Sequence, residues 1–188
     1  MKIIDTKLEE KTNMTTVNIM IIGDAGVGKT SYINRLCTGD FEYKYNDTRG
    51  ITAKNLKVET NIGNITMNLA EFSGQDLYSE IYDEFPIWRD LSACILMFSL
   101  TSKQSFRNIN KWIRKLERNV RVVPPIILCG AKCDVGGFEC ISYVDLQPYL
   151  QKGMKYYEIS SKSLYNLEKP LQEIIRKLFK NETVSVNM

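Results

Sequence analysis

A glycine-rich run near the start of the chain has the residue types needed to hold a phosphate group. Residues Gly23–Thr30 read Gly-Asp-Ala-Gly-Val-Gly-Lys-Thr and fit the pattern G-x-x-x-x-G-K-[ST]. Glycines at this spacing let successive backbone N–H groups point inward around a phosphate, with no Cβ in the way. Lys29 supplies a mobile positive charge, and the Thr30 hydroxyl is a ligand for Mg²⁺. The run predicts a nucleotide-phosphate site with magnesium.

Any reaction in this chain runs without histidine, because the sequence contains none. Ser-His-Asp, Cys-His and His-ligated metal chemistry are therefore excluded. What remains is chemistry by carboxylates, hydroxyls, lysines, amides and a metal with oxygen ligands. A cysteine clip made of Cys129, Cys133 and Cys140 is an alternative metal site, but buried thiols are the default expectation for such residues.

The elements around the phosphate loop indicate an α/β fold, because short β-rich runs alternate with helical patterns. Strands are expected at residues 16–22, 55–60, 65–71, 93–100, 125–129 and 155–159. Helices are expected at residues 29–37, 104–120, 144–150 and 167–179. The pattern predicts a six-stranded, mostly parallel sheet with one antiparallel strand and helices on both faces.

Three further motifs carry a family resemblance. Residues Cys129–Asp134 resemble the guanine-specificity motif N-K-x-D, with alanine at the Asn position, and Ile159–Lys162 resemble its partner motif S-A-K. Residues Glu71–Gln75 resemble D-x-x-G-Q. Together with the phosphate loop, these motifs resemble the small GTPases of the Ras superfamily over about residues 16–179. Stretches 38–42, 128–130 and 156–170 are most similar to the Ran family of nuclear-transport GTPases.

The resemblance implies a guanine-nucleotide switch that hydrolyses GTP, with Mg²⁺ and GTP or GDP as its ligands. By resemblance, Asp134 reads guanine, Thr48 senses the γ-phosphate, and Gln75 orients the attacking water. The implied catalytic residues are Gln75, Lys29 and Thr48. The implied metal residues are Thr30, Thr48 and, through a water, Glu71. The implied nucleotide-binding residues are Asp24, Ala25, Gly26, Val27, Gly28, Lys29, Thr30, Ser31, Phe41, Thr48, Gly74, Lys132, Asp134, Ser160, Ser161 and Lys162.

Three positions depart from the family pattern. Ala131 lacks the side-chain amide that ties the base-binding loop to the phosphate loop, so faster nucleotide exchange is expected. Glu71 replaces an aspartate and reaches one methylene further, which changes the metal geometry. Ala25 adds a methyl where the Ran family has glycine, close to the path of the catalytic glutamine. Slow hydrolysis that needs an activating partner is expected.

The chain is expected to form one G domain at residues 16–180, between a flexible segment 1–15 and a short tail 181–188. By resemblance, its partners are an exchange factor, an activating protein and importin-type receptors. The sequence contains no segment similar to the C-terminal extension of the Ran family, so partners that read that extension are expected to bind poorly.

Composition bears on the other partners and on location. The net charge of +3 argues against nucleic acid as the main partner. The longest apolar stretch, residues 94–98, is too short to span a bilayer, and no prenylation box follows Cys140. A soluble monomer in the nucleus and cytoplasm is expected, since the five scattered cysteines suit a reduced compartment.

Two groups of residues each have a structural and a functional interpretation. An apolar stripe after the glutamine is either core or part of a partner surface; its members are Tyr78, Ile81, Tyr82 and Phe85. A basic helix face is either solvated or a contact for an acidic protein; its members are Lys111, Arg114, Lys115, Arg118 and Arg121.

The sequence leaves two other functions open. In one, the three departures have cost the chain tight nucleotide binding or hydrolysis, and it is a non-cycling Ran-like module that titrates transport partners. In the other, it is an ATP-using P-loop kinase. The guanine-type motif and the absence of an arginine-rich insert argue against the kinase.

Overall fold

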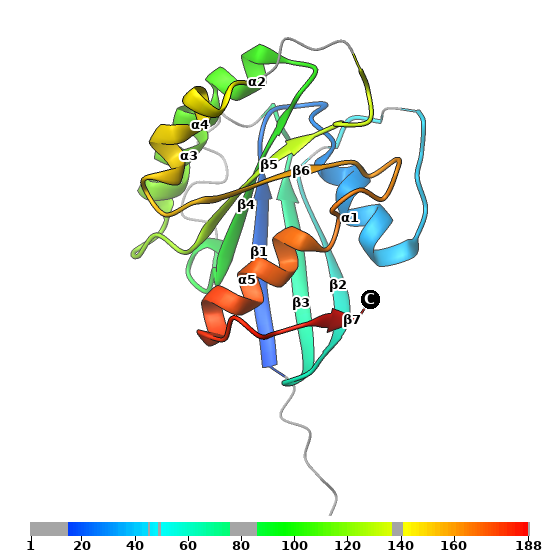
Figure 1. The fold of residues 1–188 in the computed structure, drawn as a ribbon, viewed down its shortest axis with the longest axis vertical. Coiled ribbons are helices and arrows are strands. Elements are labelled where there is room, and N and C mark those ends of the chain that lie inside the picture. The colour runs from blue at the N-terminus through cyan, green and yellow to red at the C-terminus, as the bar shows by residue number, and fades with distance from the viewer. Residues whose placement is uncertain (1–14, 45, 49, 76–85, 137–140, 188) are drawn as a thin grey trace, which may run out of the picture.

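The computed structural model describes residues 15–44, 46–48, 50–75, 86–136 and 141–187, and its centre is a seven-stranded sheet (Figure 1). The strand order is β6-β5-β4-β1-β3-β2-β7. The strands are β1 (Thr15–Ile22), β2 (Ile51–Thr60), β3 (Gly63–Phe72), β4 (Ala93–Ser99), β5 (Ile126–Ala131), β6 (Lys155–Ile159) and β7 (Val186–Asn187). The helices are α1 (Lys29–Thr38), α2 (Lys103–Arg107), α3 (Ile109–Asn119), α4 (Tyr143–Leu150) and α5 (Lys169–Phe179), with a 3₁₀ turn, η2, at Pro86–Trp88.

The predicted fold class is confirmed, with all six expected strands present. β1 pairs in parallel with β3 and β4, and the parallel order continues through β5 to β6. β2 runs antiparallel to β3, as expected for a hairpin. Every residue of β4 and β5 is buried, which explains why these strands read as unbroken apolar runs. The carboxyl ends of the parallel strands therefore meet along one edge, where the site lies.

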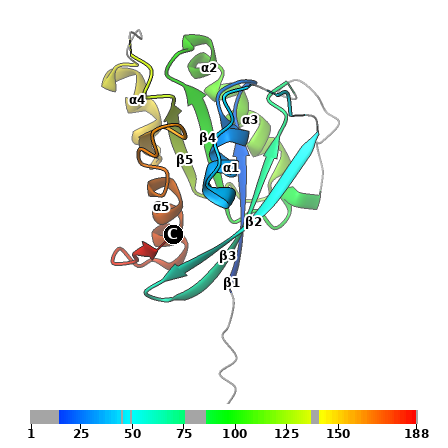
Figure 2. The same cartoon turned by 90° about the vertical axis from the view of Figure 1, so that its right-hand side faces the viewer.

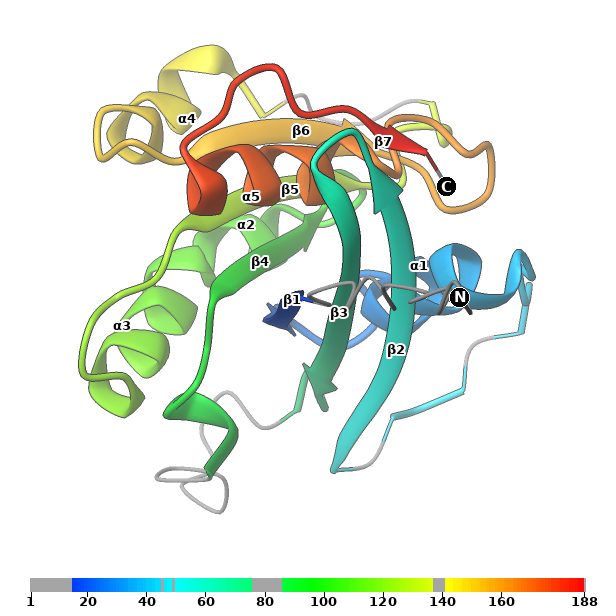
Figure 3. The same cartoon turned by 90° about the horizontal axis from the view of Figure 1, so that it is seen from below.

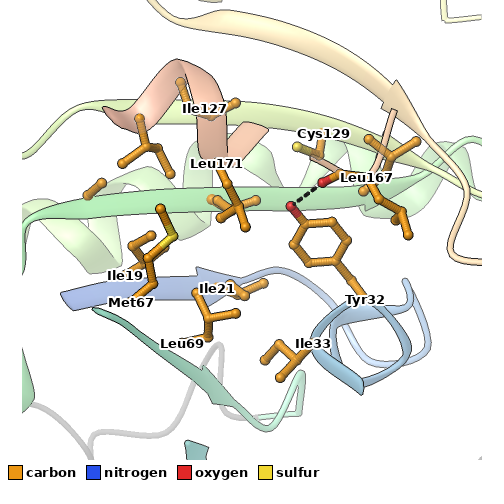
Figure 4. Close-up of a cluster of buried hydrophobic side chains, with 14 of the residues drawn as sticks. Ile19, Ile21, Tyr32, Ile33, Met67, Leu69, Ile127, Cys129, Leu167 and Leu171 are labelled. Carbon is orange, nitrogen blue, oxygen red and sulfur yellow. Dashed lines mark hydrogen bonds between the residues drawn. The ribbon is translucent and has the colours of Figure 1, made fainter. Parts of the chain in front are cut away.

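Two apolar layers cover the sheet, one on each face. One contains side chains of α1 and α5 and the other contains side chains of α3 and α4; α5 and α3 lie on opposite sides of the strands (Figure 2). Within the first layer the fully buried Tyr32 hydroxyl of α1 donates to the Leu167 carbonyl, 2.9 Å away (Figure 4). Burial raises the pKa of this tyrosine well above its ordinary value. The bond joins the helix behind the phosphate loop to the loop that leads into α5.

The seventh strand was not predicted. Residues 183–187, called the C-terminal strap here, cross α5 and place β7 beside the end of β2 (Figure 3). Val184 is fully buried in the strap, and its carbonyl accepts hydrogen bonds from Gln172 and Arg176 of α5. The Asn61 side-chain amide bonds to the strap backbone as a neighbouring strand would. It donates to the Thr183 carbonyl and accepts from the Ser185 N–H. The tail expected at 181–188 is thus part of the folded sheet through residue 187.

Two details of the predicted helices are corrected. The single helix expected at 104–120 is broken into α2 and α3 at Asn108, which ends the first and precedes the second. Lys115 does not belong to the exposed basic face, because it is buried on the core side of α3, whereas Arg114 and Arg118 are exposed. Charge alternation on a short helix does not reveal which lysine stem the core will cover.

Several predicted features lie outside the described residues. They are the flexible segment up to residue 14, the apolar stripe from Tyr78 to Phe85, and Cys140. Within the described ranges, no helix has both the length and the apolar character needed to cross a membrane.

We predict that Val184→Ala destabilises the protein, because two methyl groups are lost from a fully buried site. The expected loss is roughly 1–3 kcal/mol in the free energy of unfolding, measured by urea denaturation. Val122→Ala is the control, since Val122 is 82% exposed and its truncation is expected to change stability by less than about 0.5 kcal/mol. Equal effects of the two changes would contradict a docked strap.

Candidate nucleotide site

The phosphate loop occupies the turn between β1 and α1, and close packing fixes its shape. Gly23 follows β1 directly with φ 146°, and a Cβ at that position would lie 2.1 Å from the Met97 carbonyl oxygen of β4. No other residue type fits this approach of two backbones. The helix that follows begins at Lys29, so its first N–H groups point into the loop, as an anion site requires.

Lys29 is buried with only 5% of its surface exposed, and its charge is satisfied by the loop itself. The ammonium donates to the carbonyl oxygens of Gly23, at 2.8 Å, and Asp24, at 2.9 Å. A cavity next to it is lined by Gly26, Gly28 and Thr30, among others. The Lys29 ammonium is therefore held beside a loop rich in backbone N–H donors, where it would attract a bound phosphate strongly.

The three residues predicted to serve the metal come together from three separate segments. The Thr30 hydroxyl lies 2.7 Å from the Thr48 hydroxyl and donates to Glu71 Oε2 at 3.0 Å. The other carboxylate oxygen of Glu71 accepts from the Thr52 hydroxyl at 3.1 Å. Burial raises the pKa of Glu71, while the hydrogen bonds from Thr30 and Thr52 and the charge of Lys29 oppose that shift.

This donor set fits Mg²⁺, which prefers oxygen ligands and is completed in such sites by substrate phosphates and waters. Among the described residues no group of three or more His, Cys, Asp or Glu side chains gathers. The cysteine clip gains no support: Cys129 is buried within β5, and burial raises the pKa of its thiol.

Gly74 and Gln75 line the same cavity as the phosphate loop. A Cβ on Gly74 would be 2.0 Å from the Ala25 nitrogen, so the segment after β3 touches the phosphate loop backbone. Gln75 is exposed, and its N–H donates to the Ser73 hydroxyl at 3.3 Å. The structure therefore puts the extra methyl of Ala25 on the surface that Gln75 also borders.

A second cavity adjoins the first and has the character of a base pocket. Phe41 and Lys132 line both cavities, while Asp134 and Lys162 line the second. The other predicted nucleotide-binding residues that line one or both of these cavities are Ala25, Gly26, Val27, Gly28, Lys29, Thr30, Ser31, Thr48, Gly74 and Ser161. An aromatic ring, lysine stems and one carboxylate form a slot suited to a flat polar ring.

Ser160 contributes in a different way from the one predicted. It is fully buried and its hydroxyl donates to Asp134 Oδ1 at 2.6 Å, while the Ser163 N–H donates to the same hydroxyl oxygen. The serine therefore orients the carboxylate that faces the pocket. Asp24, also among the predicted residues, lines neither cavity with its side chain.

Lys132 supplies the tie between base loop and phosphate loop that the alanine beside it cannot make. Its ammonium donates to the Gly26 carbonyl at 2.7 Å, and its backbone adopts a left-handed φ of 66°. Ala131 itself is buried in the apolar layer. The departure at this position thus removes one link between the loops and leaves another in place.

Sequence reasoning missed residues that support the site. Tyr43 packs edge-on against Phe41, with ring centroids 5.2 Å apart, and the Lys162 ammonium lies 5.6 Å from the centre of the Tyr43 ring. Thr52, Asn108 and Trp112 hold the carboxylates of Glu71 and Asp24. Only Tyr43 left a signal in the sequence, as a second aromatic residue two positions after the predicted one.

The comparison with known protein families agrees with this geometry. The model described as the Ras family matches residues 18–180, which include the later part of β1, the phosphate loop and both base-binding motifs. The chain belongs to the Ras family. Ras-family proteins are small GTPases that bind GTP and GDP with Mg²⁺ and work as switches with regulatory protein partners.

We predict that Ser160→Ala weakens guanine nucleotide binding by about tenfold. A hydrogen bond to a charged group contributes about 1.5–3 kcal/mol, and its loss frees Asp134 to rotate away from the base. The measurement is the dissociation constant of a fluorescent GDP analogue. Ser163→Ala is the matched control, since its side chain is exposed and is expected to leave affinity unchanged. Equal affinities for all three proteins would remove Ser160 from the site.

Proposed function

We propose that this Ras-family protein is a Ran-like guanine-nucleotide switch that hydrolyses GTP slowly to GDP and phosphate. The observation that carries the proposal is the meeting of Thr30, Thr48 and Glu71 beside Lys29, in a cavity that adjoins the pocket of Asp134. Two adjoining cavities, one beside Lys29 and one beside Asp134, support the binding of phosphates and base of a single nucleotide.

Each group has a defined task in the proposed reaction. Lys29 and the loop N–H groups neutralise charge on the phosphates, and Thr30 and Thr48 hold oxygens around the metal position. Mg²⁺, when bound, would neutralise charge that develops between the β- and γ-phosphates. Gln75 orients a water that adds to the γ-phosphorus as the bond to the bridging oxygen breaks, which releases GDP and inorganic phosphate.

Slow turnover without a partner is expected from the positions of two residues. Gln75 is exposed at the rim of the cavity and has to be brought over the phosphate, and Ala25 borders the same space. An activating protein that orders Gln75 would then supply most of the rate. An exchange factor would release GDP.

The Ran-like part of the proposal comes from sequence stretches around the base pocket. Residues 156–170 span β6, the Asp134-orienting Ser160 and the start of α5. Their similarity to the Ran family supports importin-type receptors as partners, a role in nucleocytoplasmic transport, and residence in both nucleus and cytoplasm. A monomer whose main partners are proteins rather than nucleic acid completes the proposal.

The alternative is a non-cycling Ran-like module that titrates transport partners. It is favoured by the alanine at position 131 and by the carboxylate of Glu71, which two threonine hydroxyls already engage. An ATP-using kinase is disfavoured, because the oriented Asp134 carboxylate accepts the paired ring N–H and amine of guanine, and adenine offers no such pair.

We predict that Asp134→Asn changes the preferred base from guanine to xanthine. Ser160 keeps holding one oxygen, so the new amide nitrogen takes the other position and donates to the carbonyl that xanthine carries in place of the guanine amine. Competition between GDP, XDP and ADP for the fluorescent analogue measures this, with a shift of at least about tenfold expected. Asp90→Asn serves as the control. ADP competing as well as GDP with wild type would refute guanine recognition.

Phosphate release from the GTP-loaded protein tests the enzyme claim. We predict slow release over hours in Mg²⁺ buffer, and release at least about tenfold slower in Gln75→Leu, because the water loses its orienting amide. Gln151→Leu, an exposed glutamine on the far side of α4, is the control and is expected to behave as wild type.

The same samples separate the switch from the alternative. A switch is expected to bind an importin-type receptor much more tightly with GTP than with GDP. Equal affinity in both states, together with no phosphate release from wild type, would establish the non-cycling module instead.

A further inference from the structure

The Asp24 side chain points away from the nucleotide cavities and toward the start of α3. Its two carboxylate oxygens accept one hydrogen bond each, from the Asn108 amide and from the Trp112 indole N–H, both at 2.7 Å. The partners lie 84 and 88 positions along the chain from Asp24. These two bonds join the second residue of the phosphate loop to a helix on the opposite side of the sheet from α5.

Both donors are rigidly placed. Asn108 is the residue at which α2 ends and α3 begins, and its amide oxygen accepts from Gln104, which leaves the NH₂ group facing Asp24. Trp112 follows one helical turn later and is almost completely buried in the apolar layer beneath α3. The break in the helix that the sequence did not reveal is therefore what brings the amide to the loop.

Asp24 also acts through its backbone, since its carbonyl accepts from the Lys29 ammonium at 2.9 Å. One residue thus connects α3, through its carboxylate, with the cation that serves the phosphates, through its carbonyl. A carboxylate turned toward the site would repel phosphate, and the two donors hold this one away from it. Rotation of Asp24 would move a negative charge toward the phosphates and shift an oxygen that holds Lys29.

We infer that Asn108 and Trp112 are positioning residues for the nucleotide, because they clamp Asp24 and so set the shape of the phosphate loop and the rate at which nucleotide leaves it. The inference rests on the proposed function, because it presumes a bound guanine nucleotide. It adds a control of nucleotide residence time that lies outside the cavity, in a helix whose outer face is open to partners at Arg114 and Arg118.

A charge-preserving swap tests the clamp. Asp24→Asn loses one of the two bonds, and Asn108→Asp sets two carboxylates against each other; each is expected to raise the GDP dissociation rate at least about tenfold. In the double variant, the amide introduced at position 24 donates to the carboxylate introduced at position 108 and still accepts from Trp112. Both hydrogen bonds return with one reversed, so the dissociation rate is expected to return to within about twofold of wild type.

Two further variants test the clamp, one by removing the indole donor and one as a control. Trp112→Phe keeps an aromatic ring at this buried position but removes the indole N–H and part of the ring volume, without changing any charge. It is expected to speed dissociation even if a charge variant fails to fold. Asn68→Asp makes the same exchange in another hydrogen-bonded pair, Asn68 of β3 with Asn18 of β1. It is expected to leave the GDP dissociation rate unchanged. Urea denaturation of each variant separates lost stability from lost positioning.

The indole gives a direct readout. In a Trp88→Phe background, Trp112 is the remaining tryptophan, and its emission is expected to shift when nucleotide is removed. The shift should vanish in Asp24→Asn and return in the double variant.

The outcomes are distinct. Wild type that binds no guanine nucleotide would overturn the proposed function and the clamp with it. Tight binding by wild type with unchanged dissociation in the single variants would overturn the clamp alone. So would faster dissociation that the swap does not rescue.

Discussion

The phosphate loop depends on a close contact between two backbones. Because Gly23 lies against the Met97 carbonyl with no room for a Cβ, the end of β1 and the end of β4 are locked together at the point where the loop begins. This contact positions the other parts of the site. Lys29 donates to the carbonyls of Gly23 and Asp24, and α1 follows at the end of the loop. The segment that carries Gly74 packs against Asp24 and Ala25. The phosphate loop, which begins at this contact, therefore holds its backbone N–H donors in a fixed arrangement.

Around the phosphate loop, three carboxylates are held by hydrogen bonds from uncharged side chains. Glu71 is held by two threonine hydroxyls, Asp134 by Ser160, and Asp24 by an amide and an indole. Glu71 is buried, and a buried carboxylate without donors would be costly; Asp24 is half-buried and Asp134 exposed, and both are also held by donors within the protein. The site is consequently preorganised, so that binding requires little rearrangement of these groups.

The sequence predicted the strands, the phosphate loop and the meeting of Thr30, Thr48 and Glu71, because each follows from a local pattern or a recognisable motif. It did not predict contacts that join distant segments through single side chains. The role of Lys132 as a tie to Gly26 depends on a left-handed backbone, and Ser160 lost its expected place because burial decides what a serine can touch. The strap was not predicted for the same reason: the two residues of β7 are too few to show a periodicity, and Asn61 bonds to Thr183 and Ser185 across more than a hundred positions of the chain.

The C-terminal strap also bears on whether two copies of the protein associate. β7 pairs with β2 only at Glu59 and Thr60, so within the described chain the outer edge of β2 from Ile51 to Val58 has no neighbouring strand. Open edges invite chain-to-chain pairing, and lysines are a common deterrent. Lys54 and Lys57 are exposed on this stretch and project from opposite faces of the sheet. A second copy approaching edge-to-edge would bring like charges together on both faces, so resistance to aggregation is built into the strand that the strap leaves open.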